Sequence, residues 1–380
     1  MIYLDNAATS FPKPDSVYQA MDAFARHHAG NPGRSGHALA LAAQAVVDDA
    51  RRQLAELFNA PDPSRIIFAL NCTDALNIAL KGLLNPGDHV LTTSMEHNAV
   101  VRPLAALAKC GVTTTFVRCD ATGLLDPAAV AAAIVPATRL IVMSHASNVT
   151  GTIQPIAAVA ELARETDLLF MVDAAQSAGC LPLDVRTTPI DLLAFPGHKS
   201  LLGPMGTGGL YVGERAEVRS FREGGTGTAS ESPEHPDHFP FRLEAGTANV
   251  VGIAGLAAGV KFVRERGLDT IVREEQMLTE RLWQGLQALD GLTLYGPEAA
   301  SARTSIVSFN LAGWEPTDVG AILDGSFDVA VRPGLHCAPL AHQTLGTFPS
   351  GSVRLSCGAF TTPEDVDAVL TAIKEIATSL

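Results

Sequence analysis

Short apolar runs alternate along much of the chain with segments whose apolar residues recur every three or four positions. An apolar run of about four to eight residues predicts a buried strand, and the longer spacing predicts an amphipathic helix. The predicted strands between residues 65 and 212 cover 66–70, 89–93, 113–117, 140–143, 168–172, 192–195 and 209–212. Strands that are apolar along their whole length are typical of a mostly parallel sheet with helices on both faces. The pattern therefore predicts an α/β fold.

The segments outside these strands predict helices and one long loop. Helices are expected from Pro14, at 38–58, 76–84, 100–110, 128–134 and 156–165, and later up to about 266, at 269–289, at 317–323 and from Pro363. Residues 224–242 have no periodicity and many turn formers, which indicates a loop long enough to be functional or mobile.

The segment after this loop contains few strands among its helices, at 304–309, 329–331 and 353–355. Helices gathered around a few strands indicate a separate α+β domain. We expect an N-terminal arm at 1–12 that packs with the small domain, a large domain at 13–254 and a small C-terminal domain at 255–380. A chain of 380 residues is long enough for two cores.

Composition and charge narrow the classes of function. The chain is 47% hydrophobic and 18% charged, with a formal net charge of −13, which argues against nucleic acid as a partner. No apolar run is long enough to span a membrane, and no basic leader is visible, so we expect a cytoplasmic protein without a membrane partner. The six cysteines form no CxxC pair and no cluster with histidine, so we expect neither disulfides nor a metal site.

Lys199 is the first candidate for chemistry. It follows the apolar run at 192–195, and Gly197 and a glycine-rich stretch at 202–209 flank it. This context is typical of an amine delivered from a strand end into a pocket, where it can form a Schiff base with an aldehyde. An isolated lysine of this kind is more often a surface residue in a turn. Its interpretation therefore depends on its partners.

Asp173 supplies the partner. It ends the apolar strand predicted at 168–172, and Gln176 follows within one turn. Open α/β sheets bind ligands at the carboxyl ends of their strands, although an aspartate there can also be a helix cap. Pyridoxal 5'-phosphate (PLP) requires a carboxylate that keeps its pyridine nitrogen protonated. The lysine and the aspartate together predict a PLP enzyme.

Four motifs link the chain to a known family. They are Tyr3-Leu4-Asp5-Asn6-Ala7-Ala8-Thr9, Asp173-Ala174-Ala175-Gln176, Gly197-His198-Lys199 and Arg332-Pro333-Gly334-Leu335-His336-Cys337-Ala338. In combination they resemble the class V aminotransferase superfamily, and most of all its cysteine desulfurase family, which includes selenocysteine lyases. The resemblance implies PLP-dependent fold type I, in which a large domain with a mostly parallel mixed sheet carries a smaller α+β C-terminal domain.

The resemblance also implies a role for individual residues. It assigns catalysis to Lys199, Cys337 and His97, where His97 stacks on the pyridine ring and can relay protons. It assigns binding of the substrate carboxylate to Arg354, with Asn148 also near the substrate. Taken alone, Arg354 is equally well explained as part of a structural salt bridge. The expected cofactor-binding residues are Cys72, Thr73, His97, Asn148, Asp173, Gln176, His198, Lys199 and Thr247.

The phosphate of PLP has both a candidate site and a departure from the family. Asn71-Cys72-Thr73-Asp74 stands between a strand and a helix, and a helix N-terminus attracts anions, although an ordinary N-cap by Thr73 or Asp74 would leave the same signature. Relatives commonly have a phosphate-binding Ser or Thr where this chain has Pro196, which offers neither hydroxyl nor amide hydrogen. The phosphate is therefore expected to depend more on Thr73, His198 and Thr247. In the family the last of these reaches across a homodimer interface.

Cys337 separates the possible functions. Glycine and proline shape its loop, and Arg332 and His336 are close enough in sequence to favour its ionisation, although most single cysteines are buried and inert. Seventeen positions separate Cys337 from Arg354, which resembles the shorter-loop subgroup, in which a partner protein often collects the sulfur. We expect a cysteine desulfurase that converts L-cysteine to L-alanine and leaves a persulfide on Cys337.

Three alternatives stay open at this point. The same residues would serve a lyase that acts on L-selenocysteine. Another class V enzyme, such as an aminotransferase, lyase or epimerase, would keep Lys199 and Asp173 while Cys337 is incidental. A scaffold for sulfur transfer that is not an enzyme would bind partners through residues 224–242, but the presence of Lys199, Asp173 and Arg354 argues against it.

Overall fold

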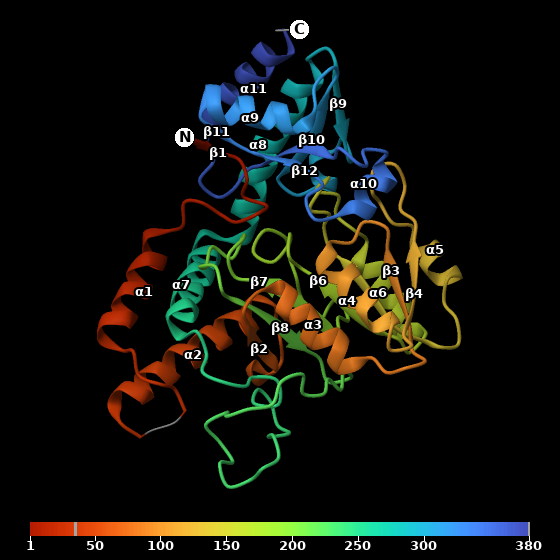
Figure 1. Cartoon of the computed structure of the whole chain (residues 1–380). Helices are drawn as coiled ribbons and strands as arrows, with labels where there is room; N and C mark the ends of the chain where they lie inside the picture. The colour runs from red at the N-terminus through yellow and green to blue at the C-terminus, as the bar shows by residue number, and fades with distance from the viewer. Residues whose placement is uncertain (34–35, 379–380) are drawn as a thin grey trace.

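The computed structural model describes residues 1–33 and 36–378 of the chain. The larger part of the molecule surrounds one large sheet, and the C-terminal elements form a smaller part above it in Figure 1. The N-terminal arm passes from the smaller part to the larger one, because β1 (Ile2–Tyr3) pairs in parallel with β11 (Val329–Ala330), whereas α1 (Asp15–His27) packs on the larger part.

A seven-stranded mixed sheet forms the centre of the larger part. Its order is β2-β8-β7-β6-β5-β3-β4. Its strands are β2 (Ile66–Ala69), β3 (His89–Thr93), β4 (Thr113–Val117), β5 (Thr138–Ser144), β6 (Leu169–Asp173), β7 (Leu192–Pro196) and β8 (Gly208–Val212). Neighbouring strands are parallel except at β8, which is antiparallel to both β7 and β2. The parallel direction places the carboxyl ends of β5, β6 and β7 at one edge of the sheet, which is where such sheets bind ligands.

Helices cover both faces of this sheet, as the apolar strands predict. Side chains of β6 alternate between two cores: Phe170 and Val172 point to one, and Leu169 and Met171 to the other. The first core also contains side chains of α2 (Ala38–Leu57), α5 (Pro127–Ala132), α6 (Ile156–Glu165) and α7 (Val250–Arg266). The second contains side chains of α3 (Cys72–Leu83) and α4 (Asn98–Ala108).

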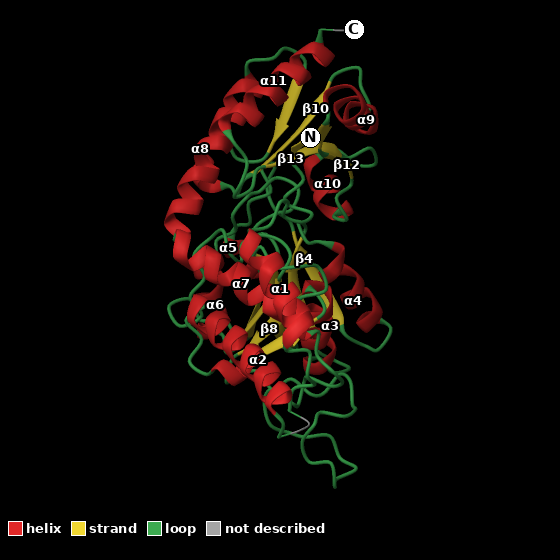
Figure 2. Cartoon of the chain, turned by 90° about the vertical axis from the view of Figure 1, so that its left-hand side faces the viewer, coloured by secondary structure: helices red, strands yellow, loops and turns green. Residues whose placement is uncertain are grey.

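The smaller part contains a four-stranded antiparallel sheet with the order β12-β13-β10-β9. Its elements are α8 (Leu268–Gln287), β9 (Leu292–Tyr295), β10 (Ile306–Leu311), α9 (Pro316–Phe327), β12 (Arg332–Gly334), α10 (Pro339–Leu345), β13 (Ser352–Ser356) and α11 (Pro363–Ala377). Short 3₁₀ turns lie at Pro63–Arg65 and Ala300–Ala302. Figure 2 shows α8 running along one side of the molecule, between α7 and the small sheet. A third core lies between this sheet and its helices.

The predicted architecture is confirmed: a mostly parallel mixed sheet covered by helices, with an α+β unit after it. Residues 213–249 contain neither helix nor strand, so the long loop at 224–242 is also confirmed. The predicted boundary between residues 254 and 255 falls inside α7, and the three proposed segments of the chain stay predictions. Within the residues described, no helix combines the length and the apolar character needed to cross a membrane.

The sequence prediction missed four short elements, namely β1, β9, β12 and α10. The β12 strand contains Pro333 and Gly334, which are unfavourable in strands, and α10 has only seven residues. The prediction also placed the start of α3 too late. The side chain of Asn71 accepts a hydrogen bond from the amide of Asp74 and so begins the helix at Cys72. The N-cap is therefore Asn71, and neither Thr73 nor Asp74 fills this role.

Candidate active site

A cavity of about 210 Å³ opens at the carboxyl ends of β5, β6 and β7 and at the N-terminus of α3. The structure brings nine of the predicted site residues to its wall. They are Cys72, Thr73, His97, Asn148, Asp173, Gln176, His198, Lys199 and Arg354. Two predicted residues lie elsewhere: Cys337 is exposed beside the cavity, and Thr247 is exposed and lines a different hollow.

Lys199 lies three residues beyond the end of β7 and lines the cavity. Burial of its amine and, to a smaller extent, the guanidinium of Arg354 lower the pKa of Lys199 to about 8, while Asp173 acts in the opposite direction. A lysine whose pKa lies near neutrality has a substantial neutral fraction, and the neutral amine is the form that attacks an aldehyde. The position of Lys199 therefore fits the nucleophilic amine that the sequence predicts.

Asp173 ends β6 and is only 3% exposed. Its Oδ1 accepts hydrogen bonds from the amide of Ala175 at 2.9 Å and from the thiol of Cys72 at 3.3 Å. Burial raises the pKa of Asp173, whereas the hydrogen bonds and the charge of Lys199 oppose this change. Burial and the nearby carboxyl group raise the pKa of Cys72, so this thiol is a neutral donor to Asp173.

The start of α3 and His198 fit a bound anion. The side chain of Asn71 satisfies the amide of Asp74, so the amides of Cys72 and Thr73 in the first turn are left for a ligand or water. Within the described part of the chain, the buried Nδ1 of His198 has no hydrogen-bond partner. Burial lowers the pKa of His198 to about 4.

His97 is the N-cap of α4, because its Nδ1 accepts a hydrogen bond from the amide of Ala99 at 3.0 Å. Burial and, to a smaller extent, the cation of Lys199 lower the pKa of His97 to about 4. A neutral imidazole that accepts at Nδ1 carries its proton on Nε2. The structure thus fixes the tautomer of the histidine that was predicted to stack on the cofactor.

The side-chain amides of Asn148 and Gln176 connect segments that are distant in sequence. Nδ2 of Asn148 donates to the carbonyl of His336 at 2.7 Å, so the loop that contains Cys337 is tied to the cavity wall. Nε2 of Gln176 donates to the carbonyl of Ala7 at 3.1 Å and so holds the N-terminal arm. Both side chains are buried.

Arg354 lies on β13, and its side chain is 1% exposed. Nη1 donates to the carbonyl of Asn148 at 2.9 Å, and Nη2 forms an ion pair with Oδ1 of Asp5 at 2.7 Å. The salt bridge that the sequence leaves open as an alternative is therefore present. Nε has no partner among the residues described, so the guanidinium can still donate to a ligand.

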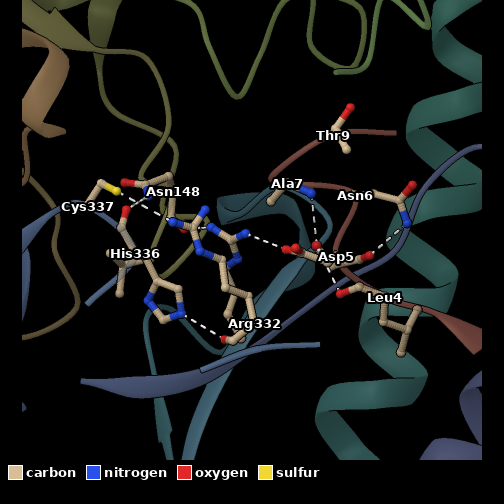
Figure 3. Close-up of polar contacts among 12 residues, drawn as sticks. Leu4, Asp5, Asn6, Ala7, Thr9, Asn148, Arg332, His336 and Cys337 are labelled. Atoms are coloured by element: carbon tan, nitrogen blue, oxygen red, sulfur yellow. Dashed lines mark hydrogen bonds and ion pairs between the residues drawn. The ribbon is translucent and has the colours of Figure 1, made fainter. Parts of the chain in front are cut away.

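Cys337 lies in the loop between β12 and α10, and its side chain is exposed. Its Sγ is 3.5 Å from Nη2 of Arg332, and its carbonyl accepts from the amide of Asn98 at 2.8 Å. His336 and Cys337 both have a positive φ, of 50° and 57°, which side-chain-bearing residues rarely adopt. Figure 3 shows Cys337 and Asp5 on opposite sides of Arg332.

The expectation that His336 favours ionisation of Cys337 is wrong. The imidazole of His336 is 2% exposed, and its Nε2 bonds to the carbonyl of Arg332 at 2.9 Å. Its Nδ1 lies 3.2 Å from Nε2 of His342. Burial and the nearby Arg354 lower the pKa of His336 to about 2, so the ring is neutral. Of the two groups named from the sequence, the guanidinium of Arg332 is the one that contacts the sulfur.

Two residues of this region were not among the predicted site residues. Arg332 lines the cavity and is the cross-strand partner of Arg354, although the sequence marked it only as a neighbour of Cys337. Glu96 is fully buried, and its carboxylate accepts hydrogen bonds from Thr93 Oγ1 at 2.6 Å and from the amide and hydroxyl of Ser144. Burial raises the pKa of Glu96 to about 7. Only its position beside His97 could have drawn attention to it.

No group of three or more His, Cys, Asp or Glu side chains that could hold a metal ion occurs within residues 1–33 and 36–378. The cavity offers an amine, two guanidinium groups, two imidazoles and a buried carboxyl group, and the exposed thiol of Cys337 lies beside it.

Comparison with known proteins agrees with this set of groups. The model of the class-V aminotransferase family matches residues 2–369. A probable cysteine desulfurase from Methanothermobacter thermautotrophicus is 35% identical, over 99% of this chain and 94% of the relative. One from Pyrococcus abyssi is also 35% identical, over 100% of this chain and 95% of the relative.

Solved structures show the same likeness. The apo structure of cysteine desulfurase from Thermococcus onnurineus superposes with a TM-score of 0.91 at 33% identity, covering 100% of this chain and 95% of that one. The S-sulfonic acid form of a cysteine desulfurase from Escherichia coli superposes with a TM-score of 0.87 at 30% identity, covering 98% and 94% of the two chains.

Proposed function

The chain belongs to the class-V aminotransferase family, and on that premise we propose that it is a PLP-dependent cysteine desulfurase that converts L-cysteine to L-alanine. The single observation that carries the proposal is the grouping of Lys199, Asp173 and Arg354 around one cavity, with the exposed thiol of Cys337 beside it. An amine, an acid and a carboxylate-binding cation are the groups that PLP chemistry on an amino acid requires.

The residues present fit PLP. The unpartnered Nδ1 of His198 and the first-turn amides of α3 at Cys72 and Thr73 would hold the phosphate. Asp173 would face the pyridine nitrogen, and the imidazole of His97 would lie against the ring. When bound, PLP supplies an electron sink for the electrons released at the substrate Cα.

The protein's own residues would then divide the remaining work. Arg354 binds the α-carboxylate of cysteine and so orients the Cα–H bond. Lys199, whose pKa is about 8, takes the Cα proton and later returns a proton to the substrate carbon. Asn148 and Gln176 hold the Cys337 loop and the N-terminal arm against the cavity.

Cys337 would carry the sulfur step. Its thiolate attacks the sulfur of the substrate, the substrate Cβ–S bond breaks, and a new S–S bond forms on Cys337. The bond electrons leave with Cβ, which gains a proton, so the products are L-alanine and a Cys337 persulfide and no external oxidant or reductant is needed. The contact with Arg332 places a positive charge beside the sulfur in this step.

We also propose a homodimer and a protein acceptor for the sulfur. The exposed position of Cys337 would allow an acceptor to reach the persulfide. Thr247 lies outside the Lys199 cavity in a single chain, which agrees with the proposal that it serves the site of the partner subunit.

The function is tested by incubating the PLP-loaded protein with L-cysteine and measuring L-alanine and the mass of the peptide that contains Cys337. We expect stoichiometric alanine without reductant, continued turnover with reductant, and one extra sulfur on that peptide. The Cys337→Ser variant should bind cysteine but form no alanine, and Cys110→Ser, which changes the other exposed cysteine, is the matched control. Full activity in Cys337→Ser, or the extra sulfur on Cys72 or Cys357, would contradict the role of Cys337.

The Cys337→Ser variant also distinguishes a cysteine desulfurase from a selenocysteine lyase. Selenium leaves carbon more readily than sulfur, so a selenocysteine lyase needs less help from a cysteine nucleophile. Residual activity of Cys337→Ser on L-selenocysteine alone would identify lyase chemistry. An absence of alanine from both substrates in the wild type would instead favour another class V reaction.

A further inference from the structure

The buried guanidinium of Arg354 is held from two directions. Nη1 donates to the carbonyl of Asn148, and Nη2 donates to Oδ1 of Asp5 at 2.7 Å. A guanidinium has five N–H donors, and these two contacts use two of them. Nε is buried without a partner in the part of the chain that the structure describes. The group is therefore fixed in position while N–H donors are left for a substrate carboxylate.

The carboxylate of Asp5 is not needed to attach the arm that carries it. The amide of Leu4 donates to the carbonyl of Ala330 at 2.9 Å, and the amide of Ala7 donates to Oγ of Ser356 at 2.9 Å. The side chain of Asn6 donates to the carbonyl of Ser356 at 3.0 Å. Figure 3 shows Asp5 between these attachments, with its carboxylate turned toward the centre of the site.

The carboxylate of Asp5 acts as a counter-ion to the positive charge of Arg354. Lys199, Arg332 and Arg354 line one cavity, and Asp173 is the only acidic residue among the described residues of its wall. Burial lowers the pKa of Arg354, and Asp5 opposes this change. A buried cation without a counter-ion is costly, because water no longer solvates it. Asp5 is 22% exposed at its side chain and so pairs with Arg354 at a lower cost of desolvation than a fully buried acid.

We propose that Asp5 is a positioning residue, which holds the guanidinium of Arg354 in the orientation that receives the α-carboxylate of the substrate. The N-terminal arm is then part of the substrate-binding site, although it lies 349 positions from Arg354 in sequence. This inference rests on the proposed function only in that the ligand is an α-amino acid. It requires no sulfur chemistry.

L-Alanine and ethylamine test this role, because they differ only by the carboxylate. Their affinities for the PLP-loaded protein are measured from the change in the visible cofactor spectrum, without turnover. Asp5→Asn should weaken L-alanine binding about tenfold, since it removes the charge that orients the guanidinium, and leave ethylamine binding unchanged. The Michaelis constant for L-cysteine should rise by a similar factor, with a smaller change in kcat.

Asn6→Ala is the matched control, since it removes a contact of the same arm with Ser356 but none with Arg354. It should leave the ratio of the two affinities at the wild-type value. Asp5→Glu, which keeps the charge, should recover part of the lost affinity for L-alanine. An unchanged ratio in Asp5→Asn, or the same change in Asn6→Ala, would overturn the proposal. Tighter L-alanine binding in Asp5→Asn would also overturn it, because Asp5 would then compete with the substrate.

The role of Asp5 can still be tested if Asp5→Asn does not fold, or if the proposed function is wrong. If Asp5→Asn does not fold, Asp5→Glu carries the same test, because it displaces the carboxylate by one methylene and should lower the affinity for L-alanine but not for ethylamine. Equal changes for both ligands would count against Asp5. If the wild type binds L-alanine but makes none from L-cysteine, the desulfurase proposal fails, and the ratio still decides the role of Asp5.

Discussion

At the scale of single residues, strand ends made the main chemistry visible in the sequence. Lys199 and Asp173 each follow a run of buried apolar residues, and the parallel sheet brings both to one cavity. The hydrogen-bonded pairs around Lys199 and Asp173 could not be predicted, because the two residues of each pair are far apart in sequence. Asp5 and Arg354 meet across 349 positions, and Glu96 and Ser144 across 48. Only the fold shows which of these groups are neighbours.

Lys199→Ala should abolish both the covalent attachment of the cofactor and turnover. Lys199 is the lysine that lines the cavity within the described part of the chain, and burial lowers its pKa to about 8. The measurement is the visible absorbance of the loaded protein and the mass of the lysine peptide after reduction with borohydride. A reducible adduct on another lysine would show that the anchor has been assigned wrongly.

Arg354→Ala should raise the Michaelis constant for L-cysteine at least tenfold and leave cofactor loading intact. A charge-assisted hydrogen bond to a carboxylate contributes about 1.5 to 3 kcal/mol, which corresponds to roughly tenfold or more in affinity. Steady-state kinetics and the cofactor spectrum measure the two effects separately. An unchanged Michaelis constant would remove Arg354 from the substrate site and leave it a purely structural role beside Asp5.

At the scale of elements, the periodic pattern predicted the long helices and the buried strands. It did not predict β12 and α10, the short elements on either side of Cys337. The β12 strand contains proline and glycine, and α10 is a seven-residue helix, so neither presents enough periodic positions. Their loop is held by buried polar contacts instead. Nδ1 of His336 lies 3.2 Å from Nε2 of His342, and Nδ1 of His342 lies 2.7 Å from Oγ1 of Thr347.

These contacts make the loop sensitive to acid. Burial lowers the pKa of His342 to about 4, below the value of 6.5 for an ordinary histidine. The unfolded chain therefore binds a proton between these pH values that the folded chain does not, so stability is complete above about pH 6.5 and is lost as the pH falls toward 4. Each such histidine contributes a slope of at most about 1.4 kcal/mol per pH unit.

His342→Asn should consequently reduce the dependence of stability on pH between about 6.5 and 4, while lowering stability at pH 7 through the lost contacts. Denaturant unfolding at a series of pH values measures this slope. The replacement of the exposed His28 by Asn is the control. An equal slope in wild type and His342→Asn would mean that the ring is already charged in the folded protein.

At the scale of the whole molecule, one chain accounts for the Lys199 cavity but leaves a second hollow without a role. This hollow, of about 500 Å³, is lined by Thr247 and by residues of α2 and of the long loop, among them Gln44, Thr226 and Pro240. Large apolar side chains are exposed at Leu39, Leu41, Leu70 and Met205, and Leu70 also lines the hollow. In the proposed homodimer, Thr247 would serve the site of a second copy of the chain.

Mixing two impaired variants tests whether Thr247 serves the site of its partner. Thr247→Ala should weaken cofactor retention, because it removes a phosphate ligand, and Lys199→Ala should be inactive. If Thr247 acts across the interface, a mixed dimer contains one site with both residues intact, namely Lys199 from the Thr247→Ala chain and Thr247 from the Lys199→Ala chain. Co-refolding the two variants at equal amounts should then restore cofactor retention and activity to about a quarter of the wild-type value, since half of the dimers would be mixed and each would have one working site.

If Thr247 acted within its own chain, no site in the mixed dimer would have both residues, so the mixture would show no gain over the separate variants. Light scattering that finds only monomers would exclude the arrangement altogether.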